Sequence, residues 1–166
     1  MTPRRPAKRP VGSTAATLAL TAAGIDVVLH PYDHDPRAES FGLEAAALLG
    51  VDPRRVFKTL MTHVDGVLCT AVVPVSGQLD LKALARVRHA SRAQLAAPEA
   101  AQRATGYVVG GISPIGQRRR HPTVLDTTVR EHRTVFVSAG RRGLDLEITA
   151  ADLVRVTEAT TGPIGR

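Results

Sequence analysis

Cysteine and aromatic residues are scarce in this chain of 166 residues, which has one cysteine, no tryptophan and only five tyrosines and phenylalanines together. Because Cys69 has no second cysteine to pair with, it forms no internal disulfide and supplies no multi-cysteine zinc site. Disulfide scaffolds and zinc fingers are therefore excluded, and a reducing compartment is expected. The few aromatic side chains also argue against binding of single-stranded RNA through many stacked bases.

Long apolar runs are absent as well. No stretch approaches the roughly 20 residues that cross a bilayer. The first ten residues are basic and proline-rich, and no signal-like apolar core follows them. We therefore expect a cytoplasmic protein without a membrane partner.

Acidic residues are outnumbered, since 15 Asp and Glu stand against 22 Lys and Arg and give a formal net charge of +7. Four positive charges lie in the first ten residues with no acid among them: Arg4, Arg5, Lys8 and Arg9. Residues 1–12 have little to bury and are expected to form a disordered basic arm. Such an arm suits a polyanion partner, although an arginine-rich composition also arises from genome base composition alone.

One compact domain is expected, because a chain of this length buries about two thirds of its surface and forms a core without disulfides. We expect it to span residues 13–160, with 161–166 as a tail. Capping residues and glycine stops predict helices at 14–24, 40–50, 79–87, 98–105 and 150–159. Apolar runs predict strands at 26–32, 56–64, 67–73, 123–126, 134–138 and 144–148. Without a repeated βαβ unit, this order indicates an α+β fold whose mixed, mostly antiparallel sheet forms a partial barrel flanked by helices.

The clearest local signal is a β-hairpin. The runs 56–64 and 67–73 are separated by Asp65 and Gly66, a pair that a type I′ turn favours. If Val64 faces Val67 across this turn, the register places Lys58 opposite Val73.

Lys58 is one of three lysines and shares a strand face with Val56 and Leu60. A cation in this position either reaches water at the end of the sheet or points into a cleft where it meets an anion. Taken alone, the pattern favours the structural interpretation.

Four glycines lie within eleven residues, at Gly106, Gly110, Gly111 and Gly116. The stretch matches neither the Rossmann pattern nor the P-loop. Glycines permit a ligand to approach backbone N–H groups closely, and such groups hold a carbonyl oxygen or an oxyanion. A surface loop that needs unusual dihedral angles is the alternative.

No metal or cofactor is expected. His30, His34 and Asp35 are the nearest approach to a ligand cluster, but strand-plus-loop spacing with a proline inside does not set two imidazoles on one face.

A nucleophilic triad is also not indicated. Ser138, His132 and Asp145 supply the residue types, but no sharp strand-to-helix turn presents the serine. The adjacent cations Arg118, Arg119 and Arg120 repel one another, an arrangement best offset by a phosphate backbone. They are candidate contacts for a nucleic-acid backbone, or else belong to a solvated loop.

Five stretches follow one another along the chain: HPYDHDP (30–36), FKTL (57–60), PVSGQLDLK (74–82), TGYVVGGISP (105–114) and GRRGLDLE (140–147). Taken together, they resemble the YbaK/EbsC family of free-standing aminoacyl-tRNA deacylases, relatives of the editing domain inserted in prolyl-tRNA synthetases. The resemblance runs from about residue 13 to residue 157. The tight turn at Asp65 and Gly66 and the basic arm depart from the family pattern.

The resemblance implies an editing pocket lined by Tyr32, Phe41, Lys58, Gly110, Ser138 and Asp145. Lys58 would meet the terminal nucleotide or the developing oxyanion, and the backbone of Gly110 and Gly111 would hold the 3′ end. Asp145 and Ser138 would orient Lys58 or the aminoacyl group. The family's Gly-x-x-x-Pro signature is completed by Pro114, which joins Tyr32, Phe41 and Gly111 as a substrate-binding residue.

The implied activity is trans-editing of Cys-tRNA(Pro), with Cys-tRNA(Cys) as a further substrate. A second hydrolytic site is needed because a pocket separates small side chains by only about 1 to 3 kcal/mol. The substrate thiol would attack its own ester carbonyl, a lyase-like cyclisation that the enzyme orients. The partners would be the aminoacyl-tRNA acceptor end and prolyl-tRNA synthetase.

Two alternatives remain open at the level of sequence. One is an Ala-tRNA(Pro) deacylase of the same superfamily, which would use water as the nucleophile. The other is a non-catalytic module that binds tRNA or a synthetase and releases no amino acid.

Overall fold

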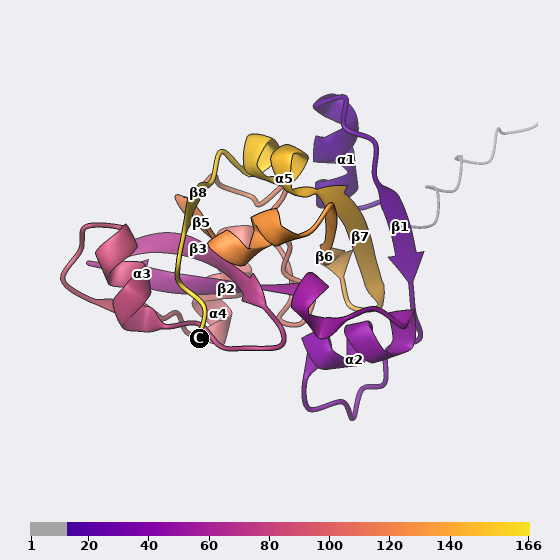
Figure 1. Cartoon of the computed structure of the whole chain (residues 1–166), viewed down its shortest axis with the longest axis horizontal. Coiled ribbons are helices and arrows are strands. Elements are labelled where there is room, and N and C mark those ends of the chain that lie inside the picture. The colour runs from indigo at the N-terminus through magenta and orange to yellow at the C-terminus, as the bar shows by residue number, and fades with distance from the viewer. Residues whose placement is uncertain (1–12) are drawn as a thin grey trace, which may run out of the picture.

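The computed structural model describes residues 13–166, so the predicted basic arm lies outside the described residues. Two sheets meet side by side, with helices around them (Figure 1). The smaller sheet has the strand order β1-β7-β6, and the larger has the order β4-β2-β3-β5-β8. The strands are β1 (Val28–Pro31), β2 (Phe57–Val64), β3 (Val67–Pro74), β4 (Ala93–Leu95), β5 (Thr123–Asp126), β6 (Thr134–Arg141), β7 (Leu144–Thr149) and β8 (Thr160–Gly162).

Five helices were expected, and five form. They are α1 (Ala15–Ala22), α2 (Phe41–Leu49), α3 (Leu81–Val87), α4 (Pro98–Thr105) and α5 (Ala150–Thr157), joined by the short 3₁₀ turns η1 (Pro53–Arg55) and η2 (Thr127–Glu131). Side-chain caps explain where most begin: Thr14 caps α1, Ser40 caps α2 and Asp80 caps α3. Helix α2 ends at Gly50, whose φ of 66° is the left-handed conformation that glycine adopts without strain.

The β2–β3 hairpin is confirmed in turn and register. Asp65 and Gly66 both have positive φ, 47° and 80°, as a type I′ turn requires. Val64 pairs with Val67, and Lys58 pairs with Val73. Local turn chemistry therefore fixes which face of β2 carries each side chain.

The α+β class and the single domain are confirmed, but the strands form two sheets and do not close into a barrel. One isolated bridge between Val56 and Phe136 connects the sheets. The larger sheet is mixed, because β3 pairs with β5 and β5 with β8 in parallel. Strands β4 and β8 were not predicted, since each has three residues and is held by its neighbour rather than by its own apolar pattern.

The main core lies between the sheets and under α1 and α5. Its fully buried side chains include Leu20, Val72, Leu125, Leu146 and Leu153. The part of the chain that the structure describes contains no helix long and apolar enough to span a membrane.

The last residues belong to the packed domain rather than to a tail. Ile164 is fully buried in a second apolar cluster with Val73 and Leu84, and Gly165 bridges to Leu79. Residues 161–166 therefore continue the larger sheet and its core.

Candidate functional site

A pocket of about 390 Å³ opens between β2, the start of α2 and the glycine-rich loop after α4. Its walls are mostly apolar and include Val56, Phe57, Leu60, Met61 and Ile112. Six of the predicted site residues line it together: Tyr32, Phe41, Lys58, Gly110, Ser138 and Asp145. Segments more than a hundred residues apart in the sequence thus converge on one cavity.

Lys58 is half-buried on β2, where the hairpin register turns it towards the pocket. Its Nζ donates a hydrogen bond to the carbonyl oxygen of Gly77 at 3.1 Å. Burial lowers the pKa of the ammonium group below its ordinary value. Lys58 therefore presents a cation that its own chain leaves without a carboxylate partner among residues 13–166.

Asp145 is the buried acid of the site. It lies on β7 between His30 on β1 and Ser138 on β6, and its side chain is only 5% exposed. Burial raises the pKa of its carboxyl group to about 6, while the nearby His30 opposes the shift. Burial and then the charge of Asp145 raise the pKa of Tyr32 to about 12. The pocket therefore holds a carboxylate that titrates just below neutral pH.

Ser138 does not belong to a catalytic triad. Its Oγ accepts a hydrogen bond from the Gly140 N–H at 3.1 Å, beside an irregularity in the β6–β7 pairing. His132, which would be the base of a Ser138–His132–Asp145 triad, does not line the pocket. Ser138 thus lines the pocket beside Asp145 without a histidine partner among the residues that line it.

The two adjacent glycines of the loop lie differently. Gly110 has a φ of +88°, and a Cβ there would lie 2.9 Å from the Phe41 ring. Gly110 lines the pocket, and its N–H has no hydrogen-bond partner within residues 13–166. The Gly111 N–H instead donates to the Val108 carbonyl oxygen at 2.9 Å.

Two predicted substrate-binding residues are therefore placed away from the pocket. Gly111 packs against the backbone of Arg141 and Arg142, where a Cβ would lie 2.8 Å away, and it does not line the cavity. Pro114 lines a second pocket on another part of the surface. In the sequence, Gly111 and Pro114 belong to the same motif as Gly110. In the structure, the loop changes direction after Gly110 and carries them away from the pocket.

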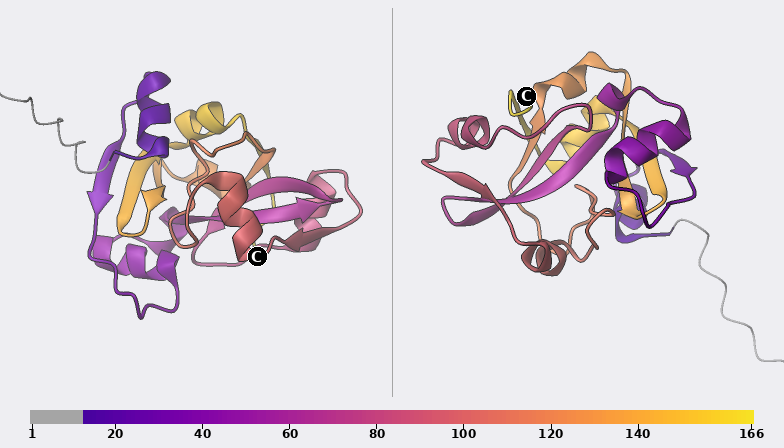
Figure 2. Two further views of the ribbon diagram at one scale, coloured as in Figure 1. Left: turned by 180° about the vertical axis from the view of Figure 1, so that it is seen from behind. Right: turned by 90° about the horizontal axis from the view of Figure 1, so that it is seen from below.

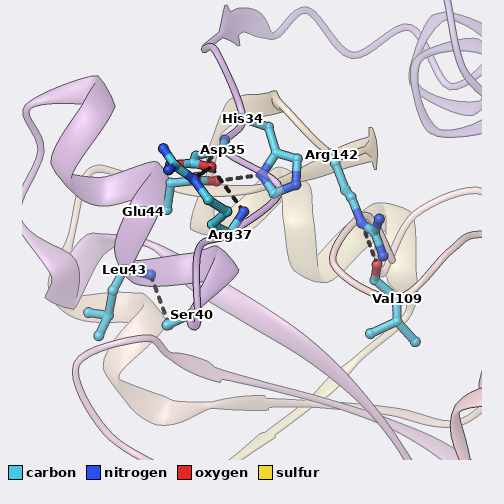
Figure 3. Close-up of polar contacts among 8 residues, drawn as sticks. All are labelled: His34, Asp35, Arg37, Ser40, Leu43, Glu44, Val109 and Arg142. Atoms are coloured by element: carbon cyan, nitrogen blue, oxygen red, sulfur yellow. Dashed lines mark hydrogen bonds and ion pairs between the residues drawn. The ribbon is translucent and has the colours of Figure 1, made fainter.

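Contacts that the sequence did not reveal hold the segments next to Phe41 and Gly110, and Figure 3 shows the polar ones. The guanidinium group of Arg142 lies 5.1 Å from the centre of the Phe41 ring, and its Nε donates to the Val109 carbonyl oxygen at 2.8 Å. On the other side, His34 Nδ1 lies 2.7 Å from Glu44 Oε1. These contacts tie the β6–β7 turn, the glycine-rich loop and α2 together around Gly110.

The sequence alone also did not identify Thr59 as a residue of the pocket. Its Oγ1 is buried and has no hydrogen-bond partner in the described part of the chain, and the residue lines the pocket. Only its place beside Lys58 in the sequence could have indicated it.

The three adjacent arginines lie elsewhere. Arg119 and Arg120 line the second pocket, of about 480 Å³, beside the C-terminal ends of α1 and α5. Arg120 forms an exposed ion pair with Glu158, and Arg118 packs against Gly106. None of the three lines the pocket that contains Lys58.

Comparison with known proteins identifies the class. Residues 36–156 match the model of the aminoacyl-tRNA editing domain. Since this match covers most of the chain and includes most of the pocket, the chain belongs to the aminoacyl-tRNA editing domain family, and the resemblance to YbaK/EbsC proteins is confirmed.

Individual relatives agree with this assignment. EbsC of Enterococcus faecalis, named as a candidate Cys-tRNA(Pro)/Cys-tRNA(Cys) deacylase, is 34% identical over 114 residues, which are 68% of this chain and 69% of EbsC. The crystal structure of the hypothetical protein APE2540 has a TM-score of 0.83 at 25% identity, covering 92% of this chain and all of that one. That of a candidate trans-editing enzyme for prolyl-tRNA synthetase also has a TM-score of 0.83, at 21% identity over 96% and 99% of the two chains, and shares the fold.

Proposed function

We propose that this protein is a trans-editing deacylase that removes cysteine from Cys-tRNA(Pro), and also from Cys-tRNA(Cys). The observation that carries the proposal is the convergence of Lys58, the free Gly110 N–H and buried Asp145 on one pocket that contains no nucleophilic triad. Such a pocket suits a substrate that supplies its own nucleophile. The name of EbsC supports the same substrate.

In the proposed reaction the substrate thiol loses its proton, and its sulfur attacks the ester carbonyl carbon. A C–S bond forms, the bond from carbonyl carbon to ribose oxygen breaks, and the ribose oxygen takes up a proton. The products are deacylated tRNA and a four-membered cyclic thioester, which water opens to cysteine. Because the attack is intramolecular, correct orientation alone supplies several kcal/mol of barrier lowering, as an order-of-magnitude figure.

Each polar group has a defined part in this scheme. Lys58 and the Gly110 N–H stabilise the negative charge that develops on the carbonyl oxygen. Asp145 accepts hydrogen bonds from the α-ammonium group of the cysteinyl residue, and Ser138 orients the same group. Tyr32 and Phe41 enclose the aminoacyl end and limit its size.

A series of esters tests the proposal. Cysteinyl-, seryl- and alanyl-tRNA(Pro) are incubated with the enzyme, and release of the amino acid is followed. Cysteinyl-tRNA should be cleaved and seryl-tRNA spared, since a hydroxyl at neutral pH is a far weaker nucleophile than a thiol. Lys58→Ala should abolish cleavage without loss of fold. Preferential cleavage of alanyl-tRNA would instead indicate that water is the nucleophile. Salt-sensitive tRNA binding without any cleavage would indicate a non-catalytic module.

The proposed substrate also indicates the partners of the protein. A domain that reads the acceptor end has few means to recognise an anticodon, so the proposal includes transient association with prolyl-tRNA synthetase in the cytoplasm. Arg118, Arg119 and Arg120 are proposed contacts for the tRNA backbone, although Arg120 must first leave Glu158. Copurification of tagged protein with the synthetase, with and without tRNA, tests the association.

A further inference from the structure

The only hydrogen bond to the Lys58 ammonium within residues 13–166 comes from outside the pocket lining. Gly77, in the loop between β3 and α3, supplies its carbonyl oxygen at 3.1 Å from Nζ. The loop is turned by a hydrogen bond from the Gly77 N–H to the Pro74 carbonyl oxygen. The direction of the Lys58 side chain therefore depends on where this loop is held.

The C-terminal segment holds the loop. Gln78 and Arg166 exchange two backbone hydrogen bonds, of 2.9 and 2.8 Å, and the Asp80 N–H donates to the Ile164 carbonyl oxygen at 2.7 Å. Gly77 packs flat against the same segment, since a Cβ there would lie 2.6 Å from the Arg166 carbonyl oxygen. In Figure 1 the yellow C-terminal segment runs down from α5 to this loop.

Asp126 in turn holds the C-terminal segment. It lies at the end of β5 and is 4% exposed. Its Oδ1 accepts hydrogen bonds from the N–H groups of Ile164, at 3.0 Å, and Gly165, at 2.8 Å. Its Oδ2 accepts from the Thr128 N–H and hydroxyl group. A buried carboxylate with four donors is a rigid anchor, because any donor that left would expose an uncompensated charge.

We propose that Gly77 and Asp126 are positioning residues for Lys58, acting through the C-terminal segment Ile164–Arg166. The contacts form one continuous series, from the Asp126 carboxylate through the backbone of this segment to the Gly77 carbonyl oxygen and Lys58 Nζ. The inference rests on the proposed function, in which Lys58 meets the reacting ester.

The physical reason is the flexibility of lysine. Its side chain has four rotatable bonds and loses up to about 2 kcal/mol of rotamer entropy when fixed. A carbonyl oxygen held in place removes part of this freedom before substrate binds. Displacement of a catalytic group by about 1 Å costs up to 100-fold in rate.

Gly77→Ala is the sharpest probe. The backbone of Gly77 is outside the left-handed region, so alanine fits its dihedral angles, but the added Cβ meets the Arg166 carbonyl oxygen and pushes loop and segment apart. The control is Gly24→Ala after α1, whose Cβ would meet no atom within 4 Å and which touches neither the Gly77 loop nor the C-terminal segment. Asp126→Asn is the second probe, and thermal unfolding identifies folded variants.

Two readouts separate positioning from stability. The first is the steady-state kinetics of Cys-tRNA(Pro) deacylation, where Gly77→Ala and Asp126→Asn should lower kcat by about 10- to 100-fold with little change in KM. The second is the ¹⁵Nζ signal of Lys58 in lysine-labelled protein, assigned readily because the chain has only three lysines. This signal should shift in both probes and stay unchanged in Gly24→Ala.

The outcomes are distinct. Unchanged kcat and an unchanged Lys58 signal in a folded Gly77→Ala protein overturn the inference, as does an equal loss of kcat in Gly24→Ala. If wild-type protein cleaves no cysteinyl ester, the proposed function fails instead, and the Lys58 signal still tells whether the C-terminal segment positions the lysine.

Discussion

At the scale of the residue, the most informative group is Asp145. A carboxyl group whose pKa rises to about 6 on folding, from 3.8, binds more protons in the folded state than in the unfolded state between these values. The contribution of Asp145 to the free energy of unfolding therefore falls as pH rises from about 4 to 6 and stays low above. Burial of Asp145 therefore lowers the stability of the protein at neutral pH, where the carboxyl group is charged inside the pocket.

Asp145→Asn should reveal this exchange. At pH 7 the variant should gain stability over wild type, by up to about 1.4 kcal/mol for each unit of the pKa shift, whereas at pH 4 the two should be equal. Deacylation by the wild type should rise with pH through about 6, and the variant should lose this rise with at least about tenfold lower kcat/KM. Urea unfolding at both pH values and a pH–rate profile measure the two effects, and a variant no more stable than wild type at pH 7 would contradict the assignment.

Residue types alone could not supply several parts of the site. The motif around Gly110 identified a backbone donor, but only the folded loop shows that the Gly111 N–H is already bonded to Val108. Arg142 was hidden because two adjacent arginines in a turn look the same in sequence, and the fold places one of them against Phe41. The local backbone conformation decides which N–H group is free and which arginine meets Phe41. This conformation cannot be read from a single sequence.

At the scale of the element, local chemistry was readable and remote pairing was not. The hairpin followed from Asp65 and Gly66, and α2 followed from its Ser40 cap and Gly50 stop. Strands β4 and β8 depend on partners distant in the chain. Remote pairing also explains why one sheet was predicted and two are observed. The two sheets are connected by one isolated bridge.

The glycine-rich loop supplies a prediction for its own element. Gly110→Ala adds a Cβ against the Phe41 ring at a φ of +88°, while Gly24→Ala adds one in open space at a φ of +69°. Gly24→Ala should cost about 1 kcal/mol of backbone strain, and Gly110→Ala about 1 to 3 kcal/mol more because of overpacking. Only Gly110→Ala should lower kcat/KM. Chemical denaturation with parallel deacylation assays checks this, and equal costs for both substitutions would show that the entrance is loosely packed.

At the scale of the whole molecule, charge and shape act together. Figure 2 shows the two sheets and their helices from behind and from below, with the C-terminus brought back against the body of the fold. The net charge of +7 includes four cations in the first ten residues. Long-range attraction to a polyanion such as the proposed tRNA substrate would therefore come from the entire chain as well as from the pocket.

Deletion of residues 1–12 tests the contribution of this segment. Each phosphate contact contributes a slope of about 0.7 to 0.9 to the fall of log affinity with log salt concentration. If all four cations contact tRNA, the deletion should reduce this slope by about 3 and leave kcat unchanged. Filter binding of tRNA over a salt series measures the slope, and an identical slope in the shortened protein would exclude the segment from binding.

The order of the chain has one last consequence. The pocket joins Tyr32 to Asp145, and the partner of Lys58 is held by residues 164–166, which follow every other element. A variant truncated before Ile164 should therefore keep the residues that line the pocket but lose the backbone hydrogen bonds that hold the Gly77 loop.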